Sequence, residues 1–255
     1  MSSFPSSTYS NAQKKWIGRD HIVYPTVTRA LDNWQLIKGK KVLDVGCGNG
    51  CISKKLIDGG AAEVLGVDNS EEMVATAMKN FGDVEGLQFK HQSISAIHYK
   101  GAGVFDVAVA ILVLQFMKDE QELRSAIQNI FNSLKADGLL VAIVPNGVKD
   151  YNPTRTDGLK FGAAVNLKDD LRLHDGRRLD VEFFDDGEIV GSSKVTFFFN
   201  ETYEKILRDA GFAKVEFLHP IISDEGLKLY GDEFFASYLS PPKDIVIRAY
   251  KSRNL

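Results

Sequence analysis

The segment 42–50, which reads VLDVGCGNG, carries a short apolar run directly into three glycines. The apolar run predicts a strand that breaks at Gly46, and the residues after Gly50 predict a helix. Glycines at such a turn tolerate positive φ and let a ligand approach the backbone closely. This segment therefore predicts a strand–turn–helix unit that holds a ligand, a pattern shared by many nucleotide-binding proteins.

Strands and helices alternate on both sides of this turn, which is typical of a doubly wound parallel sheet. The expected strands are residues 40–45, 63–67, 87–90, 106–112, 139–144, 213–218 and 244–250, and the expected helices are residues 21–36, 52–58, 71–81, 119–134 and 201–210. The pattern predicts an α/β protein with a Rossmann-like, seven-stranded and mostly parallel sheet.

Residues 146–199 interrupt this alternation. Two β-rich runs, 178–184 and 194–199, flank a turn signal at 185–187, so we expect an antiparallel cap inserted after the fifth strand, beside the ligand crevice of the sheet. The chain is expected to be a single domain, residues 1–255. Its expected parts are an N-terminal lid or helix (1–38), a cofactor-binding core (39–145), the cap (146–199) and the C-terminal part of the sheet (200–255).

Composition excludes several classes of protein. The net charge is −3 and the basic residues form no stripe, which argues against a nucleic-acid partner. No apolar run reaches the length of a membrane span or signal peptide. The two cysteines provide no disulfide framework, so a cytoplasmic location is expected, and no cluster of Cys and His predicts a metal site.

The charged residues around the turn limit the kinds of ligand that it can bind. Asp44 stands two residues before Gly46, and Cys51 occupies the position where a dinucleotide fingerprint has Gly or Ala. A carboxylate beside a pyrophosphate is repulsive, whereas beside the ammonium and sulfonium groups of S-adenosylmethionine it is favourable. Asp68 lies 18 residues beyond Gly50 (68 − 50), the spacing at which a carboxylate receives ribose hydroxyls.

With these residues, the chain resembles the class I S-adenosylmethionine-dependent methyltransferases, closely over residues 40–145 and loosely over 200–250. The resemblance implies that the glycine turn binds the methionine part of the cofactor, that the acid after the second strand binds its ribose, and that Ser93 stands in place of the acid expected near the adenine. The cofactor-binding residues expected on this basis are Tyr9, Asp44, Gly46, Cys47, Gly48, Asp68, Asn69, Ser93, Ile94 and Ala110.

The resemblance also implies that residues 112–116, after the fourth strand, line the methyl-transfer site. We expect Gln115, Asn146 and His219 to contact the substrate. No catalytic residue is assigned, because displacement at an activated methyl group requires alignment and exclusion of water more than acid–base groups. Nitrogen, oxygen, carbon and sulfur all remain open as the methylated atom.

The expected function is methyl transfer from S-adenosylmethionine to a small molecule, with S-adenosylhomocysteine as product. Residues 202–235 are loosely similar to toxoflavin-type N-methyltransferases, which favours a secondary metabolite as acceptor. Two alternatives remain: an NAD(P)-dependent oxidoreductase, against which Asp44 and Cys51 argue, and a non-catalytic subunit that binds S-adenosylmethionine and partners another protein.

Overall fold

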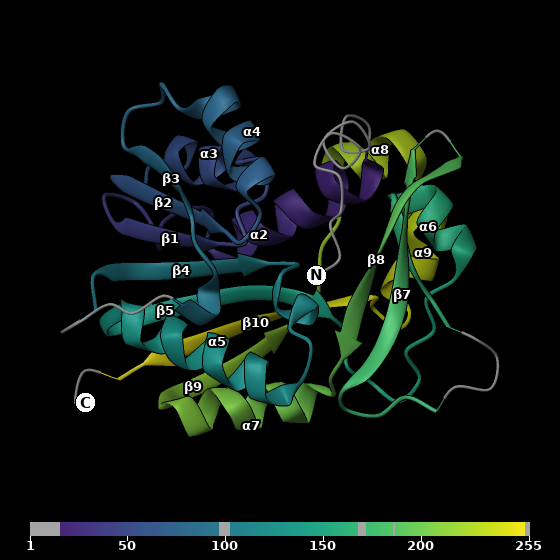
Figure 1. Ribbon diagram of the computed structural model, residues 1–255. Helices are drawn as coiled ribbons and strands as arrows, with labels where there is room; N and C mark the ends of the chain where they lie inside the picture. The colour runs from purple at the N-terminus through teal and green to yellow at the C-terminus, as the bar shows by residue number, and fades with distance from the viewer. Residues whose placement is uncertain (1–15, 97–102, 168–171, 186, 253–255) are drawn as a thin grey trace.

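The computed structural model describes residues 16–96, 103–167, 172–185 and 187–252. Within these ranges, seven strands form one sheet in the order β3-β2-β1-β4-β5-β10-β9 (Figure 1). The strands are β1 Lys41–Val45, β2 Glu63–Asp68, β3 Leu87–His91, β4 Phe105–Ile111, β5 Leu134–Pro145, β9 Phe212–Leu218 and β10 Asp244–Lys251. The predicted Rossmann-like α/β sheet is confirmed.

The sheet is parallel except at β10, which runs antiparallel to both β5 and β9. Two short helices, α8 (Asp224–Tyr230) and α9 (Asp232–Leu239), join β9 to β10. Because this connection leaves β9 and enters β10 at the same edge of the sheet, β10 must run in the opposite direction. The first residue of β10 therefore lies at the carboxyl edge, where the glycine turn also lies.

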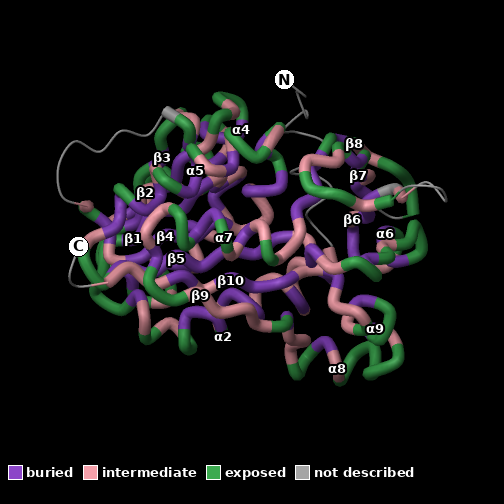
Figure 2. Tube along the Cα trace, turned by 90° about the horizontal axis from the view of Figure 1, so that it is seen from below, coloured by how far each residue is buried: buried purple, intermediate pink, exposed green. Residues whose placement is uncertain are grey.

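Helices cover both faces of the sheet. On one face lie α2 (Tyr24–Ala30), α3 (Cys51–Asp58) and α4 (Glu71–Phe81), and on the other lie α5 (Glu120–Ser133) and α7 (Asn200–Ala210). Figure 2 shows buried positions running through the central strands. β4 is buried over most of its length, which explains its nearly continuous apolar sequence. In the described ranges, no helix is long and apolar enough to cross a membrane.

The predicted helix over residues 21–36 is wrong in its second half. A π-helical turn, η2 (Arg19–Val23), leads into α2, which ends at Ala30. Asp32, Asn33 and Trp34 all have positive φ, of 51°, 49° and 70°. Left-handed residues cannot continue a right-handed helix. The helix therefore ends at Ala30, although apolar residues continue at helical spacing beyond it.

The cap is a three-stranded antiparallel sheet within the described residues: β6 (Ala163–Asn166), β7 (Arg177–Asp185) and β8 (Glu188–Phe197), preceded by α6 (Arg155–Phe161). β7 and β8 correspond to the two predicted strands, while α6 and β6 are short elements that sequence periodicity missed. The cap has a core of its own, formed by Tyr151, Val165, Leu179, Val181, Phe183, Val195 and Phe197.

The two ends of the cap are fastened together where it leaves and rejoins the sheet. Asn200, the first residue of α7, donates from Nδ2 to Oδ1 of Asn146 (2.8 Å). Its Oδ1 accepts the N–H of Gly147 (2.9 Å), and its own N–H bonds the Gly147 carbonyl (3.0 Å). We call this group of residues the Asn146–Asn200 clasp.

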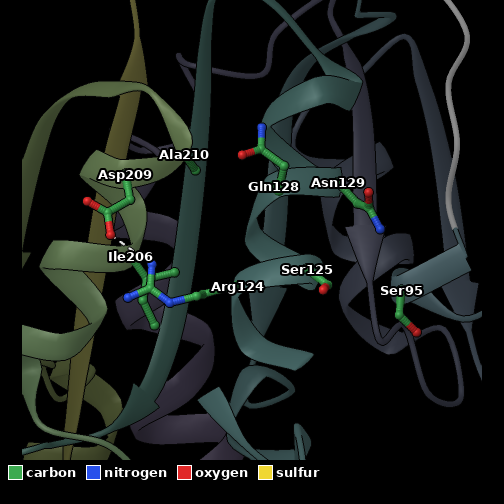
Figure 3. A pocket seen from close by; sticks show the side chains of 8 residues that line it. All are labelled: Ser95, Arg124, Ser125, Gln128, Asn129, Ile206, Asp209 and Ala210. Atoms are coloured by element: carbon green, nitrogen blue, oxygen red, sulfur yellow. Dashed lines mark hydrogen bonds and ion pairs between the residues drawn. The ribbon is translucent and has the colours of Figure 1, made fainter. Parts of the chain in front are cut away.

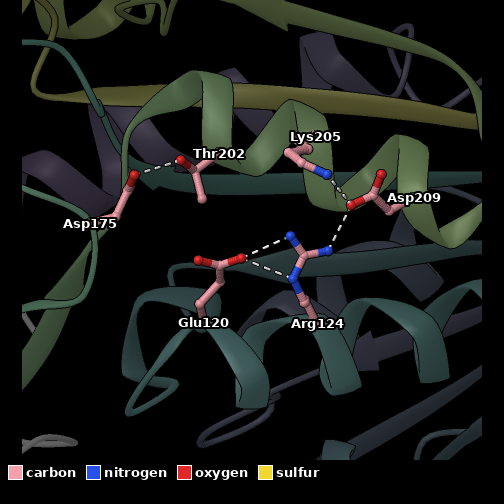
Figure 4. Close-up of polar contacts among 6 residues, drawn as sticks. All are labelled: Glu120, Arg124, Asp175, Thr202, Lys205 and Asp209. Atoms are coloured by element: carbon pink, nitrogen blue, oxygen red, sulfur yellow. Dashed lines mark hydrogen bonds and ion pairs between the residues drawn. The ribbon is translucent and has the colours of Figure 1, made fainter.

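A second link joins the loop before β7 to the start of α7 (Figure 4). The Asp175 carboxylate accepts the N–H of Phe199 through Oδ1 (2.7 Å) and the hydroxyl of Thr202 through Oδ2 (2.8 Å). Thr202 belongs to the first turn of α7, where a negative charge is favoured by the helix dipole. Asp175 therefore acts as a helix cap supplied by a distant part of the chain.

Asp175→Ala should lower the free energy of unfolding by about 1–2 kcal/mol, because a side-chain cap at a helix N-terminus contributes that much. Urea unfolding followed by circular dichroism provides the measurement. Asp180→Ala is the matched control, since Asp180 forms an exposed ion pair with Lys194 across the cap sheet. Equal, small effects of both substitutions would contradict the capping role.

Candidate functional site

The glycine turn after β1 is fastened to the end of β2. The N–H groups of Gly46 and Cys47 both donate to the carbonyl of Val67, at 2.8 and 3.0 Å. Gly46 and Gly48 have positive φ, of 70° and 53°. A Cβ on Gly46 would lie 2.3 Å from the Val113 side chain, whereas a Cβ on Gly48 would meet no atom within 4 Å. Gly46 is thus required by packing, and Gly48 leaves open space at the turn.

Asp68, the last residue of β2, connects this turn to the next helix. Its Oδ2 accepts the N–H of Gly48 and its Oδ1 accepts the N–H of Ser70, both at 2.9 Å. The Ser70 hydroxyl in turn caps α4 by accepting the N–H of Met73. Burial raises the pKa of Asp68, although the hydrogen bonds from Ser70 and Gly48 oppose the shift. The carboxylate therefore lies beside the open face of Gly48.

Asp44 lies behind the turn. It is 1% exposed, and its Oδ2 accepts the hydroxyl of Ser53 in the first turn of α3 at 2.5 Å. Burial raises the pKa of Asp44 to about 7, against the hydrogen bond from Ser53, and the Asp68 charge raises it further. The position suits a structural support for the turn, and the expected contact of Asp44 with a cofactor stays a prediction.

The residues expected near an adenine follow β3 and β2 at the same edge. Ser93 bonds the hydroxyl of Ser95 at 2.7 Å, and the Ile94 carbonyl accepts Nδ2 of Asn129 at 2.9 Å. The carbonyl of Asn69 bonds Nε2 of His91 at 3.1 Å. Ala110 is fully buried within β4, and its expected contact with the cofactor stays a prediction.

The segment 112–117, which we call the bridge, links the glycine turn to the cap. Leu112 has a φ of 54°, and Val113 packs against Gly46. At the other end, the Met117 carbonyl accepts the hydroxyl of Thr196 from β8. Between them lies Gln115, which is 5% exposed and whose Oε1 is buried without a hydrogen-bond partner among the described residues. An unpaired buried oxygen is costly unless a ligand or water supplies the donor.

The other two expected substrate residues lie elsewhere along the carboxyl edge. Asn146 is 3% exposed and belongs to the clasp, and its Nδ2 also donates to the Pro242 carbonyl (2.8 Å). His219 is exposed, and its carbonyl accepts a bond from Arg29. Both line a cavity of about 430 Å³ with acidic and apolar residues. Gln115 is not part of that lining, and the substrate roles of Asn146 and His219 stay predictions.

A second cavity, of about 470 Å³, opens between α5 and α7 (Figure 3). Its lining residues are Ser95, Arg124, Ser125, Gln128, Asn129, Ile206, Asp209 and Ala210. Arg124 pairs with Asp209 at 2.7 Å. None of the predicted site residues that the structure describes lines this cavity, which lies on a helical face of the protein and not at the glycine turn.

Two further expectations concern a tyrosine and a metal. Tyr9, expected beside the cofactor, lies outside the described residues. Among the residues that the structure describes, no group of three His, Cys, Asp or Glu side chains is arranged to hold a metal ion.

Sequence reasoning missed the aromatic side of the glycine turn. Tyr24 of α2 bonds Cys51, the first residue of α3. The Nζ of Lys55 lies 4.2 Å from the centre of the Tyr24 ring, and the Arg19 guanidinium lies 5.6 Å from it. Burial raises the pKa of Tyr24, so this hydroxyl stays protonated. The sequence shows only a tyrosine within an expected helix, a signal that does not specify its partner.

The glycine turn and Asp68 lie in the part of the chain that is similar in sequence to known proteins. Residues 42–138 match the family model described as a methyltransferase domain. A ubiquinone biosynthesis O-methyltransferase from Coxiella burnetii (strain Dugway 5J108-111) is 34% identical over 121 residues, which cover 47% of this chain and 50% of that protein. The chain thus spans about half the length of the curated relatives it matches.

Solved structures share the fold over most of the chain. An S-adenosylmethionine-dependent methyltransferase from Mesorhizobium loti matches with a TM-score of 0.62 at 20% identity, covering 89% of this chain and 97% of that one. The 1,6-didemethyltoxoflavin-N1-methyltransferase of Burkholderia thailandensis matches with a TM-score of 0.57 at 17% identity, covering 96% and 84%. Residues 42–138 thus match a methyltransferase domain, and the chain shares the fold of S-adenosylmethionine-dependent methyltransferases, in agreement with the resemblance.

The buried Asp44 generates a prediction about stability. Its pKa rises from the ordinary 3.8 to about 7, so the folded protein holds a proton that the unfolded chain releases across this interval. The free energy of unfolding should therefore fall as pH rises through this window, by roughly 1.4 kcal/mol for each pH unit. Asp44→Asn keeps an acceptor for Ser53 and should flatten this slope.

Urea unfolding between pH 4 and pH 8 (roughly the window over which a buried acid titrates) measures the slope. Asp58→Asn is the control, because Asp58 is an exposed acid at the end of the same helix, α3. The same slope in the wild type and in Asp44→Asn would show that Asp44 titrates normally in the folded protein.

Proposed function

We propose that this protein transfers a methyl group from S-adenosylmethionine to a small molecule. The observation that carries the proposal is the Asp68 carboxylate, held by the N–H groups of Gly48 and Ser70 beside the open face of Gly48. A carboxylate oxygen has two lone pairs, so each oxygen can accept a ribose hydroxyl in addition to the bond it already receives.

The residues around this point have distinct roles in the proposal. Gly48 lets the methionine part of the cofactor approach the backbone, and Asp68 binds the ribose. Ser93 and Ile94 lie along the same edge, toward the adenine. When bound, S-adenosylmethionine supplies a methyl group on a positively charged sulfur. The chain has to align the acceptor with that carbon and exclude water.

The bridge is the part of the chain that we assign to the acceptor. It contacts the glycine turn through Val113 and the cap through Met117, so a molecule bound against it lies between the two. The unpartnered Oε1 of Gln115 is suited to accept a hydrogen bond from an N–H or O–H of the acceptor. A dehydrated site of this kind discriminates strongly against analogues that lack the donor.

The acceptor that we propose is a small hydroxyl compound, of the kind found among secondary metabolites and quinone precursors. Several curated relatives, including the one from Coxiella burnetii, are named ubiquinone biosynthesis O-methyltransferases, which supports an oxygen as the target. We also propose that residues 39–145 bind the cofactor and that residues 146–199 close over the acceptor bound against the bridge, within a single domain. The net charge of −3 supports a small molecule over a nucleic acid.

Isothermal titration calorimetry tests the cofactor directly. S-adenosylhomocysteine should bind with a dissociation constant in the micromolar range, roughly −7 to −8 kcal/mol. NADH and NADPH should give no saturable heat, because Asp44 precedes the turn where a pyrophosphate would bind and Cys51 replaces the Gly or Ala of a dinucleotide fingerprint. Saturable binding of NADH without binding of S-adenosylhomocysteine would overturn the proposed function.

Asp68→Ala should weaken binding of S-adenosylhomocysteine by about 10- to 100-fold, since hydrogen bonds to a charged acceptor contribute roughly 1.5–3 kcal/mol. 5′-Methylthioadenosine, which keeps the ribose but lacks the amino-acid part, separates two explanations. An equal loss for both ligands indicates that Asp68 binds the ribose. A loss confined to S-adenosylhomocysteine would mean that Asp68 only shapes the glycine turn.

A further inference from the structure

Asp244 places a carboxylate at the carboxyl edge of the sheet, outside the residues discussed so far. It is the first residue of β10 and pairs with Pro145, the last residue of β5. β5 is next to β4, which in turn pairs with β1, the strand that carries the glycine turn. In Figure 1, β10 begins beside α9 and the cap. Asp244 therefore lies at the same edge as the bridge, on the side toward the cap.

The side chain of Asp244 faces the same side of the sheet as the helix that follows the glycine turn. Val246, two residues further along β10, packs in the core with α2 and α3. Side chains two apart on a strand share a face. Asp44, which bonds α3, also points to this face. Asp244 and the glycine turn thus border the same side of the carboxyl edge.

One oxygen of this carboxylate is held in place. The buried Tyr238 of α9 donates its hydroxyl to Oδ2 of Asp244. Asp244 itself is half-buried, and its Oδ1 is not among the buried, unpaired atoms of the described residues. The tyrosine thereby orients the carboxylate through Oδ2, and no hydrogen bond from a described residue occupies Oδ1.

The other titratable groups near Asp244 come from three elements. Tyr151, from the segment before α6, is buried and feels the charges of both Asp244 and Asp157. Asp157 of α6 keeps Oδ2 in a capping box with Thr154. Lys243 is directed away, because its Nζ donates to the carbonyl and Oδ1 of Asn152 at 3.1 and 2.6 Å.

The pKa of Asp244 is raised, and within the described ranges its carboxylate forms no ion pair. Burial raises the pKa of Asp244 to about 6, and the hydrogen bond from Tyr238 opposes the increase. The carboxylate is largely ionised at neutral pH and is a stronger base than an exposed aspartate.

We propose that Asp244 accepts the proton of the acceptor's hydroxyl group during methyl transfer, with Tyr238 as the residue that positions it. This inference rests on the proposed function. The hydroxyl oxygen forms a bond to the methyl carbon while the carbon–sulfur bond breaks, and that electron pair remains on sulfur. The oxygen's proton passes to Oδ1 of Asp244 and then to water, so the products are the methyl ether, S-adenosylhomocysteine and a proton.

A base is useful here because a neutral hydroxyl is a poor nucleophile, and its oxygen becomes strongly acidic as it gains the methyl group. A base is less important when the acceptor is already ionised. The dependence on Asp244 should therefore decrease as the acidity of the acceptor increases, a trend that a purely structural aspartate would not produce.

Methylation of catechol and of the more acidic 4-nitrocatechol, followed by mass spectrometry, tests the proposal. Asp244→Asn should lower kcat/KM for catechol by about 10²- to 10⁴-fold and for 4-nitrocatechol by much less. In the wild type, activity toward catechol should fall below about pH 6, and this acid limb should be absent in Asp244→Asn.

Tyr238→Phe keeps the carboxylate but removes the bond that lowers its pKa, so the acid limb should move to higher pH with much of the activity retained. Asp224→Asn, at an exposed acid in the first turn of α8, is the control and should match the wild type. Circular dichroism and calorimetry with S-adenosylhomocysteine establish that each variant is folded and binds cofactor.

Equal losses for both catechols, or an acid limb that persists in folded Asp244→Asn, would overturn the proposal. So would a wild-type protein that binds S-adenosylhomocysteine but methylates neither catechol, and in that case the proposed function would still stand. Absence of S-adenosylhomocysteine binding in the wild type would instead reject the proposed function and this inference together.

Discussion

The fastening of the glycine turn to the end of β2 is the constraint on which the rest of the site depends. Two N–H groups of the turn bond one carbonyl of Val67, and a third, from Gly48, bonds the Asp68 carboxylate. These bonds join neighbouring parallel strands, so the turn is tied to the sheet at three points. The positive φ values at Gly46 and Gly48 allow it to close tightly. The edge of the sheet is thereby organised by hydrogen bonds of the chain itself.

The bridge connects the glycine turn to the cap. Val113 occupies the space that a side chain at position 46 would need, and Leu112 adopts a left-handed conformation to bring it there. A non-glycine residue in this region of φ is strained, and such strain gathers at functional positions. Packing against the glycine turn on one side and the bond from Thr196 on the other hold this strained segment in place. The unpaired oxygen of Gln115 lies between these two fixed points.

Much of the sheet follows from the sequence because buried parallel strands are continuous apolar runs, and β4 is the clearest example. Asp68 was also foreseeable, since its spacing from Gly50 is fixed by one strand and one helix. Short elements, such as the helices α6 and α8 and the strand β6, contain too few residues to show a period in the sequence. The end of α2 was missed because no glycine marks the three successive left-handed residues, although Asp32 and Asn33 adopt this conformation more readily than most residue types.

The positions of the candidate site residues were predictable where they follow directly from a single strand. The turn, Asp68 and Gln115 follow directly from strands that the pattern reveals. Asp244 and Tyr238 are not local, because their meeting depends on β10 entering the sheet in the opposite direction to β5. Asn146 illustrates a different difficulty. Its position after β5 predicts a contact with the substrate, yet its side-chain amide also forms hydrogen bonds within the protein.

That use of Asn146 has a consequence for how such a protein diversifies. The Asn146–Asn200 clasp brings the beginning and the end of the 147–199 segment to a single point, so the chain leaves the sheet after β5 and returns to it through α7 at the same place. Insertions are tolerated best where the two ends of the inserted chain lie close together. The segment is therefore suited to exchange with that of a relative, provided that the contacts of Asp175 with α7 and of Thr196 with the bridge are kept.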